Sequence, residues 1–162
     1  MLVSVRAGRL IAATLVCAAF VLGVSSMATK AGAQGDKVSH TCSLADKQFV
    51  QTVSTNMFQL SYWSDQLAKG ETGPAVVVKQ VKFGSGQVDA TRPTDPTLEK
   101  TRPLLKAMFL NYANAVHKQT HGGNAGRPMG VAYQLANDVH DLLAAAQPAL
   151  AAKGCDVTVL LS

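Results

Sequence analysis

Apolar residues recur at helical spacing in three long stretches of this 162-residue chain. In the first stretch, between Ser43 and Gly70, the series consists of Phe49, Val53, Met57, Leu60, Trp63 and Leu67. Spacings of three and four residues place such side chains on one face of a helix. Ser43 and Asp46 match a capping box, with aspartate in place of the usual glutamate, and Gly70 suits the C-terminal stop. We therefore predict a long amphipathic helix here.

Two later stretches show the same spacing. One begins with Asp95 as cap and Pro96 in its first turn, or restarts at Thr101. Its apolar seam is Leu105, Met108, Phe109, Tyr112 and Val116. The other opens near Pro128 and ends before Gly154. Its apolar series is Val131, Leu135, Val139, Leu142, Leu143, Ala146 and Leu150. Each stretch predicts a further long helix.

The segment between the first two helices is ambiguous. Val76 to Phe83 is β-branched enough for a strand, yet it also suits a short helix behind Pro74. We favour the short helix, because a lone strand in a helical domain has nothing to pair with. Gly84 to Gly86, with the prolines that follow, predicts a long loop up to the second long helix.

The first 33 residues match a secretory signal peptide. Arg6 and Arg9 precede an apolar run from Leu10 to Val24, and Ala31-Gly32-Ala33 before Gln34 fits the peptidase pattern. The run is shorter than the roughly 20 residues that a membrane anchor needs. The expected organisation is a signal peptide at 1–33 and a single secreted helical domain at 34–162, extracellular or periplasmic, with no stable membrane insertion after cleavage.

Removal of the signal leaves two cysteines, Cys42 and Cys155, which permit one intramolecular pairing. Disulfides persist in exported proteins, and closing so long a loop stabilises by about 4.7 kcal/mol in the chain-entropy model. The bridge would tie the start of the first helix to the end of the last. We therefore predict an all-α fold: a small disulfide-stapled helical bundle of three long helices plus one short helix or irregular segment. The tail from Asp156 is expected either to lie on the bundle as a short extended piece or to fray.

Charge and motifs exclude several functional classes. Cleavage removes Arg6, Arg9 and Lys30, so the formal charge falls from +5 to 5 − 3 = +2. No basic cluster marks a nucleic-acid surface, and the protein is therefore not expected to bind nucleic acid. The chain also lacks the nucleophile elbow G-x-S-x-G and the phosphate loop G-x-x-x-x-G-K-[ST].

His117 and His121 stand four residues apart, a spacing that lets two imidazoles share one Zn²⁺. Lys118 occupies the place of the glutamate in the zinc-peptidase motif, which excludes that enzyme class. With Tyr112 at 0°, the two histidines fall at about 140° and 180°, away from the apolar seam. A solvated helix end, an exposed metal-binding pair and part of a roofed ligand site all stay open.

Several aromatic side chains also fall off the apolar seams. With Phe49 at 0°, Phe58 lies at about 180° and Tyr62 at about 220°. Either the Val76–Phe83 segment covers this pair as a lid, or the pair is an exposed patch of the kind that binds partners. In the second case Phe58, Tyr62, Val77 and Phe83 would line a pocket. On the third long helix, Tyr133 and His140 share a second face, which is either solvated or ligand-binding.

The favoured function is non-catalytic binding of a small apolar or haem-like ligand by a secreted protein. The candidate contacts are Phe58, Tyr62, Phe83, Tyr133 and His140, with His117 and His121 as candidate metal ligands, so haem and zinc are the candidate cofactors. The helical layout bracketed by Cys42 and Cys155 after a signal peptide resembles, in outline, small secreted haem-binding proteins of mycobacteria. The alternatives are a cell-surface protein–protein interaction module and a small helical enzyme that binds an anionic metabolite through Arg92, Arg102 and Arg127.

Overall fold

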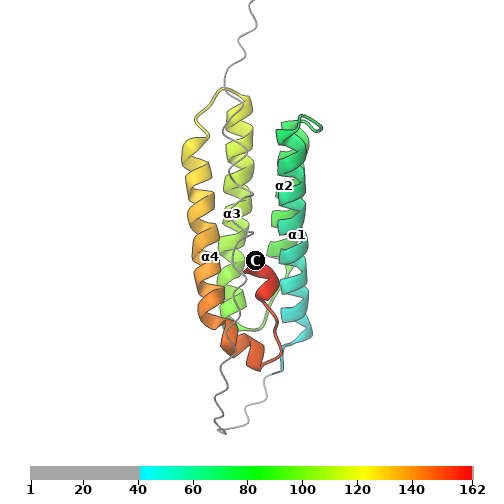
Figure 1. The fold of residues 1–162 in the computed structure, drawn as a ribbon, viewed down its shortest axis with the longest axis vertical. Coiled ribbons are helices and arrows are strands. Elements are labelled where there is room, and N and C mark those ends of the chain that lie inside the picture. The colour runs from blue at the N-terminus through cyan, green and yellow to red at the C-terminus, as the bar shows by residue number, and fades with distance from the viewer. Residues whose placement is uncertain (1–40, 162) are drawn as a thin grey trace, which may run out of the picture.

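The computed structural model describes residues 41–161, so the predicted signal peptide and cleavage site lie outside the described residues. Four α-helices run alternately up and down (Figure 1). They are α1 (Leu44–Ala68), α2 (Pro74–Ala90), α3 (Pro96–Thr120) and α4 (Gly126–Ala152), followed by the 3-10 turn η2 (Thr158–Leu160). No strand occurs in this part of the chain, and the all-α bundle prediction is confirmed. None of the described helices is long and apolar enough to cross a membrane.

Helix α2 is longer than the sequence indicates. It continues through Gly84, Ser85 and Gly86 to Ala90, so the loop predicted there is wrong. The reason is a tertiary contact. A Cβ atom at position 84 would lie 2.6 Å from the Oδ1 atom of Asn56 in α1, so glycine is what lets the two helices approach.

The helices pack in chain order, α1 on α2, α2 on α3 and α3 on α4, while η2 packs on both α1 and α4 (Figure 1). The fully buried core draws side chains from all four helices: Phe49, Val53, Val77, Val88, Leu98, Phe109, Leu143 and Leu150. The tail lies on the bundle, as one of the two alternatives expected, but Thr158–Leu160 forms a 3-10 turn instead of an extended piece. Val157 is buried in the core, and η2 follows it.

The disulfide prediction is confirmed, with the Cα atoms of Cys42 and Cys155 5.0 Å apart. Ser43 forms the capping box with Asp46, as predicted. The carboxylate of Asp46 also accepts hydrogen bonds from the backbone N–H groups of Thr94 (2.6 Å) and Asp95 (2.9 Å). The start of α1 is thereby fixed to the loop before α3. We call the region formed by the Cys42–Cys155 bridge, Ser43, Asp46 and residues 94–95 the disulfide end.

Burial of Asp46 raises its pKa, but the hydrogen bonds from Asp95, Ser43 and Thr94 outweigh that effect and lower the pKa from 3.8 to about 2. Asp95 is buried as well, and its carboxylate accepts a 2.8 Å hydrogen bond from the Nζ atom of Lys153. Both buried carboxylates therefore have partners. The disulfide end is a structural joint.

Candidate ligand-binding site

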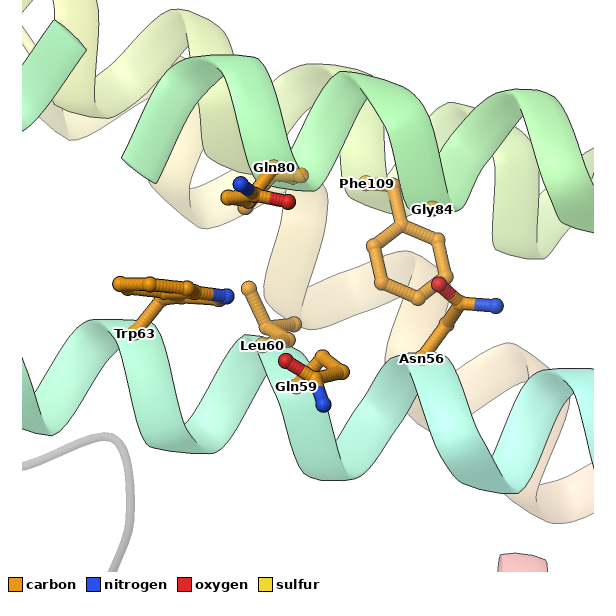
Figure 2. A pocket seen from close by; sticks show the side chains of 8 residues that line it. Asn56, Gln59, Leu60, Trp63, Gln80, Gly84 and Phe109 are labelled. Atoms are coloured by element: carbon orange, nitrogen blue, oxygen red, sulfur yellow. The ribbon is translucent and has the colours of Figure 1, made fainter. Parts of the chain in front are cut away.

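A hollow lies on the seam where α1 packs against α2 (Figure 2). It has a volume of about 190 Å³, open solvent at its mouth included. Its lining consists of Asn56, Gln59, Leu60 and Trp63 from α1, Gln80, Val81 and Gly84 from α2, and Phe109 from α3. The apolar side chains and polar amides thus surround one small space, in which no lining residue is charged.

Asn56 is a buried amide on the apolar seam of α1. Its Nδ2 donates to the carbonyl of Thr52 at 2.8 Å, and its Oδ1 faces Gly84. Sequence reasoning missed Asn56 and the hollow beside it. The signal was present, because a polar residue at about −20° from Phe49 sits inside the apolar stripe of the helix.

Trp63 contributes an unsatisfied donor to this hollow. Its Nε1 atom is buried and has no hydrogen-bond partner among the residues that the structure describes. In Figure 2 the indole nitrogen lies on the side of the ring that faces the other lining residues. A buried donor without an acceptor costs about 1–3 kcal/mol, so this N–H is a candidate contact for an acceptor atom of a ligand.

Exposed apolar side chains occur on both helices that line the hollow. Phe58 and Tyr62 of α1 are 70% and 46% exposed, and Val76 and Phe83 of α2 are 41% and 62% exposed. We call these four residues the aromatic face. The Tyr62 ring meets the Trp63 ring edge-on, with 5.1 Å between ring centroids. Tyr62 also follows Gln59 by three residues, and Phe83 follows Gln80 by three, so both rings stand one helical turn from lining residues of the hollow.

The two interpretations of Phe58 and Tyr62 can now be separated. Both side chains point off the seam, as predicted, but the Val76–Phe83 segment does not cover them, so the lid prediction is wrong. The expected four-residue pocket does not form either, because Val77 is fully buried in the core. A hollow with a different lining lies next to the aromatic face instead.

Tyr133 and His140 lie seven residues apart on α4, and both are substantially exposed. Seven residues make about two helical turns, so the two side chains share one side of the helix. The Nδ1 atom of His140 lies 3.4 Å from a carboxylate oxygen of Asp141. Neither residue lines the hollow, and their role in ligand binding stays a prediction.

His117 and His121 are exposed at the end of α3, in agreement with the predicted outward orientation. Their ring centroids are 4.1 Å apart, and the Nδ1 atom of His121 lies 2.8 Å from the His117 carbonyl oxygen. That contact leaves the Nε2 atom of His121 as its available ligand atom. In the described residues, the one group of three potential ligands is Cys42, Asp46 and Cys155, where the two sulfurs are bonded to each other.

Two of the three arginines proposed for an anionic substrate, Arg92 and Arg102, are held by neighbouring groups, while the role of Arg127 on α4 stays a prediction. Arg102 is held by Glu99 at 2.7 Å and by Asp89 at 2.9 Å. Arg92 donates to the backbone carbonyls of Asp89 and Thr91. The hydrogen bond from Lys106, supported by the charge of Arg102, lowers the pKa of Asp89. Arg102 and Lys106 thus pair with Asp89 and Glu99 near the end of α2.

Comparisons with protein-family models, with curated proteins and with solved structures find no match to this chain. What the protein does must therefore be argued from its own geometry, in which the aromatic face and the adjoining hollow are the features that the fold itself leaves unexplained.

Proposed function

We propose that this protein is a secreted, non-catalytic binding protein that holds a small, flat, apolar ligand of haem-like shape against its aromatic face. The observation that carries the proposal is the exposure of Phe58, Tyr62 and Phe83 on two packed helices. Aromatic rings bury 150–250 Å² each, about as much as any side chain can offer a ligand, and exposed apolar patches often mark binding sites.

The size of the hollow favours a ligand lying across the surface. Enclosed ligand pockets measure about 300–1,000 Å³, whereas this hollow reaches about 190 Å³ with its open mouth included. A flat molecule could stack on the exposed rings and extend one edge toward the hollow. Offset or edge-to-face ring contacts contribute about 0.5–1.5 kcal/mol each beyond the burial of area.

Secretion is supported by two features. The Cys42–Cys155 disulfide persists in oxidising compartments, and the first 33 residues have the pattern of an export signal. A carrier outside the cell needs a stable scaffold, and here the disulfide end provides it at a distance along α1 from the aromatic face.

A second candidate function is a protein–protein interaction module that uses the same face. The small volume of the hollow favours it, because a protein partner needs exposed anchor rings more than an enclosed cavity. The two candidates differ in stoichiometry and in the size of the bound species, which one set of variants can separate.

The test uses the oxidised chain from Gln34 to Ser162. Haemin is titrated while the Soret band and the emission of Trp63 are followed, and Zn²⁺ is titrated in parallel because His117 and His121 stay a candidate pair. Saturable haemin binding at micromolar concentration is expected, without turnover of the ligand. No spectral change with haemin or with other flat apolar probes would contradict the proposal.

The contribution of the aromatic face is measured with a matched pair of variants. Replacing Phe58, Tyr62 and Phe83 together with alanine should weaken binding at least about tenfold, the loss of roughly 1.4 kcal/mol or more of ring contacts. The control replaces Val131 and Leu142, exposed apolar residues of α4, with alanine. Equal affinity in both variants would place the site elsewhere, and pull-down of a defined protein partner that depends on the same three rings would favour the interaction module.

A further inference from the structure

We infer that the hollow between α1 and α2 is a carbonyl-binding subsite, and that among flat apolar ligands the aromatic face holds most tightly those whose edge carries an uncharged carbonyl oxygen. The inference rests on the proposed function, since it specifies the polar end of the same ligand. It assigns to Trp63 the role of hydrogen-bond donor to that oxygen.

The chemistry of Trp63 sets the kind of group that binds. An indole N–H is a donor and never an acceptor, so only an acceptor atom can satisfy it. The Nε1 atom is buried without such a partner in the described part of the chain. A ligand oxygen placed there would form a hydrogen bond and remove the penalty of the unpaired donor at the same time.

The size of the hollow limits that group to a single oxygen. The hollow has room for about one water-sized group. A carbonyl oxygen fits such a space, whereas a carboxylate or a phosphate brings further oxygens that would need more room.

The lining of the hollow is uncharged, and this also favours a neutral ligand group. No lysine, arginine or histidine is among the residues that line the hollow. An ionised group placed there would lose its hydration without a counter-charge, which is far more costly than burial of a neutral oxygen. The hollow therefore favours a ketone, a quinone or a lactam over an acid.

The position of Trp63 connects this subsite to the aromatic face. Its ring meets that of Tyr62 edge-on at 5.1 Å, so a flat ligand on Tyr62 has its edge next to the indole. Gln59 and Gln80 line the hollow from the two opposite helices (Figure 2). Ring stacking and one directed hydrogen bond would together fix both the plane and the orientation of the ligand.

The test compares two probes of the same ring system, 9-fluorenone and fluorene, which differ by a carbonyl in place of a methylene group. Their dissociation constants for the oxidised chain from Gln34 to Ser162 are measured by equilibrium dialysis. The same measurement is made on Trp63→Phe, which keeps an aromatic ring but lacks the N–H. The preference for fluorenone over fluorene should be about three- to tenfold greater in the wild-type protein than in the variant.

The outcomes separate this inference from the proposed function. An equal preference in the wild-type protein and in Trp63→Phe would overturn the carbonyl subsite, and the hollow would then hold a water molecule, while binding of both probes would leave the proposed function intact. Failure of both probes to bind while haemin still binds would overturn the carbonyl subsite alone, and failure of both probes and of haemin would overturn the proposed function and this inference with it.

A steric pair of variants provides an independent check. Gly84→Ala places a methyl group against Asn56 inside the hollow, whereas a Cβ atom at Gly86 meets nothing within 4 Å. Gly84→Ala should lower the fluorenone preference, and Gly86→Ala should leave it unchanged. A preference unaffected by Gly84→Ala in a folded protein contradicts the subsite; if that variant does not fold, the comparison with Trp63→Phe decides.

Discussion

The two halves of α1 lie in contrasting environments. At its beginning, in the disulfide end, Asp46 is buried and its carboxylate is saturated with hydrogen bonds from the capping box and from the loop before α3. Further along the same helix, Trp63 buries a donor with no acceptor in the described residues, and the rings of Phe58 and Tyr62 are exposed. The first half satisfies its buried carboxylate, and the second leaves its buried indole donor unpaired.

This difference indicates where the fold is tied together and where it is available to a ligand. Satisfied buried networks are typical of structural joints, while unpaired buried groups and exposed apolar surface call for an explanation beyond folding. Substitutions at the disulfide end are therefore expected to change stability, and substitutions at the aromatic face are expected to change binding.

The largest expected effect comes from the disulfide. Replacing Cys42 and Cys155 together with serine releases a loop whose ends are 113 residues apart. The chain-entropy model predicts a loss of about 4.7 kcal/mol in the free energy of unfolding, and measured values for such bridges fall mostly at about 2–5 kcal/mol. Urea denaturation of the variant and of the oxidised wild type measures the difference. A loss below about 1 kcal/mol would mean that the disulfide end does not tie the bundle together.

A smaller loss is expected at Asp46. Asp46→Ala leaves the backbone N–H groups of Thr94 and Asp95 without their acceptor and should cost about 3 kcal/mol, since hydrogen bonds to charged groups contribute about 1.5–3 kcal/mol each. The control is Asp65→Ala in the same helix, where the exposed ion pair with Lys69 contributes little to stability. Equal losses in the two variants would contradict the special role of the disulfide end.

The same residue makes the stability of the protein depend on pH in the acidic range. Because the folded-state pKa of Asp46 is lowered from 3.8 to about 2, its contribution is complete above pH 3.8 and is lost as the pH falls through 2. Wild-type stability should therefore decrease across this window more steeply than that of Asp46→Ala. Parallel acid titrations followed by far-ultraviolet circular dichroism, compared at matched urea concentrations, would show whether the two curves converge at low pH. Curves that stay parallel would contradict the assignment of the low pKa to Asp46.

Two glycines of α2, Gly84 and Gly86, are expected to give opposite changes in the free energy of unfolding when each is replaced with alanine. Gly84→Ala forces a Cβ atom to 2.6 Å from the Oδ1 atom of Asn56, and such overpacking costs about 1–3 kcal/mol. Gly86→Ala meets no neighbour and should stabilise α2 by about 0.5–1 kcal/mol, because alanine is the better helix former. Thermal or urea unfolding of both variants shows the direction of each change in stability. Stabilisation by both would show that the seam has room to adjust.

Gly84 also shows why part of the fold escapes sequence reasoning. Three long helices and the disulfide follow from local spacing, capping residues and the cysteine count, and the structure confirms them. In α2, by contrast, Gly84-Ser85-Gly86 indicates a loop when read locally, while the actual reason for Gly84 is a neighbour in another helix. A contact between residues distant in sequence has no local signature.

Sequence reasoning likewise predicts one part of the candidate site and misses another. Helical phase alone is enough to place Phe58 and Tyr62 off the seam of α1, because phase depends only on the spacing of residues along the chain. Whether another segment covers them depends on tertiary packing, and the expected lid is absent because both rings stay exposed. The unpaired Nε1 atom of Trp63 is invisible to both arguments, because it is defined by partners that fail to approach.

The smallest effect on stability is expected at the aromatic face. Phe58 is 70% exposed, so Phe58→Ser removes little buried area and should change the free energy of unfolding by no more than about 0.5 kcal/mol. The same substitution should weaken binding of a flat apolar ligand several-fold, by about 0.5–1.5 kcal/mol, if its ring stacks on the ligand. Urea denaturation and ligand titration on one protein sample give both values. A variant that loses stability but keeps its affinity would place Phe58 with the core-supporting residues and reverse the contrast between the two halves of α1.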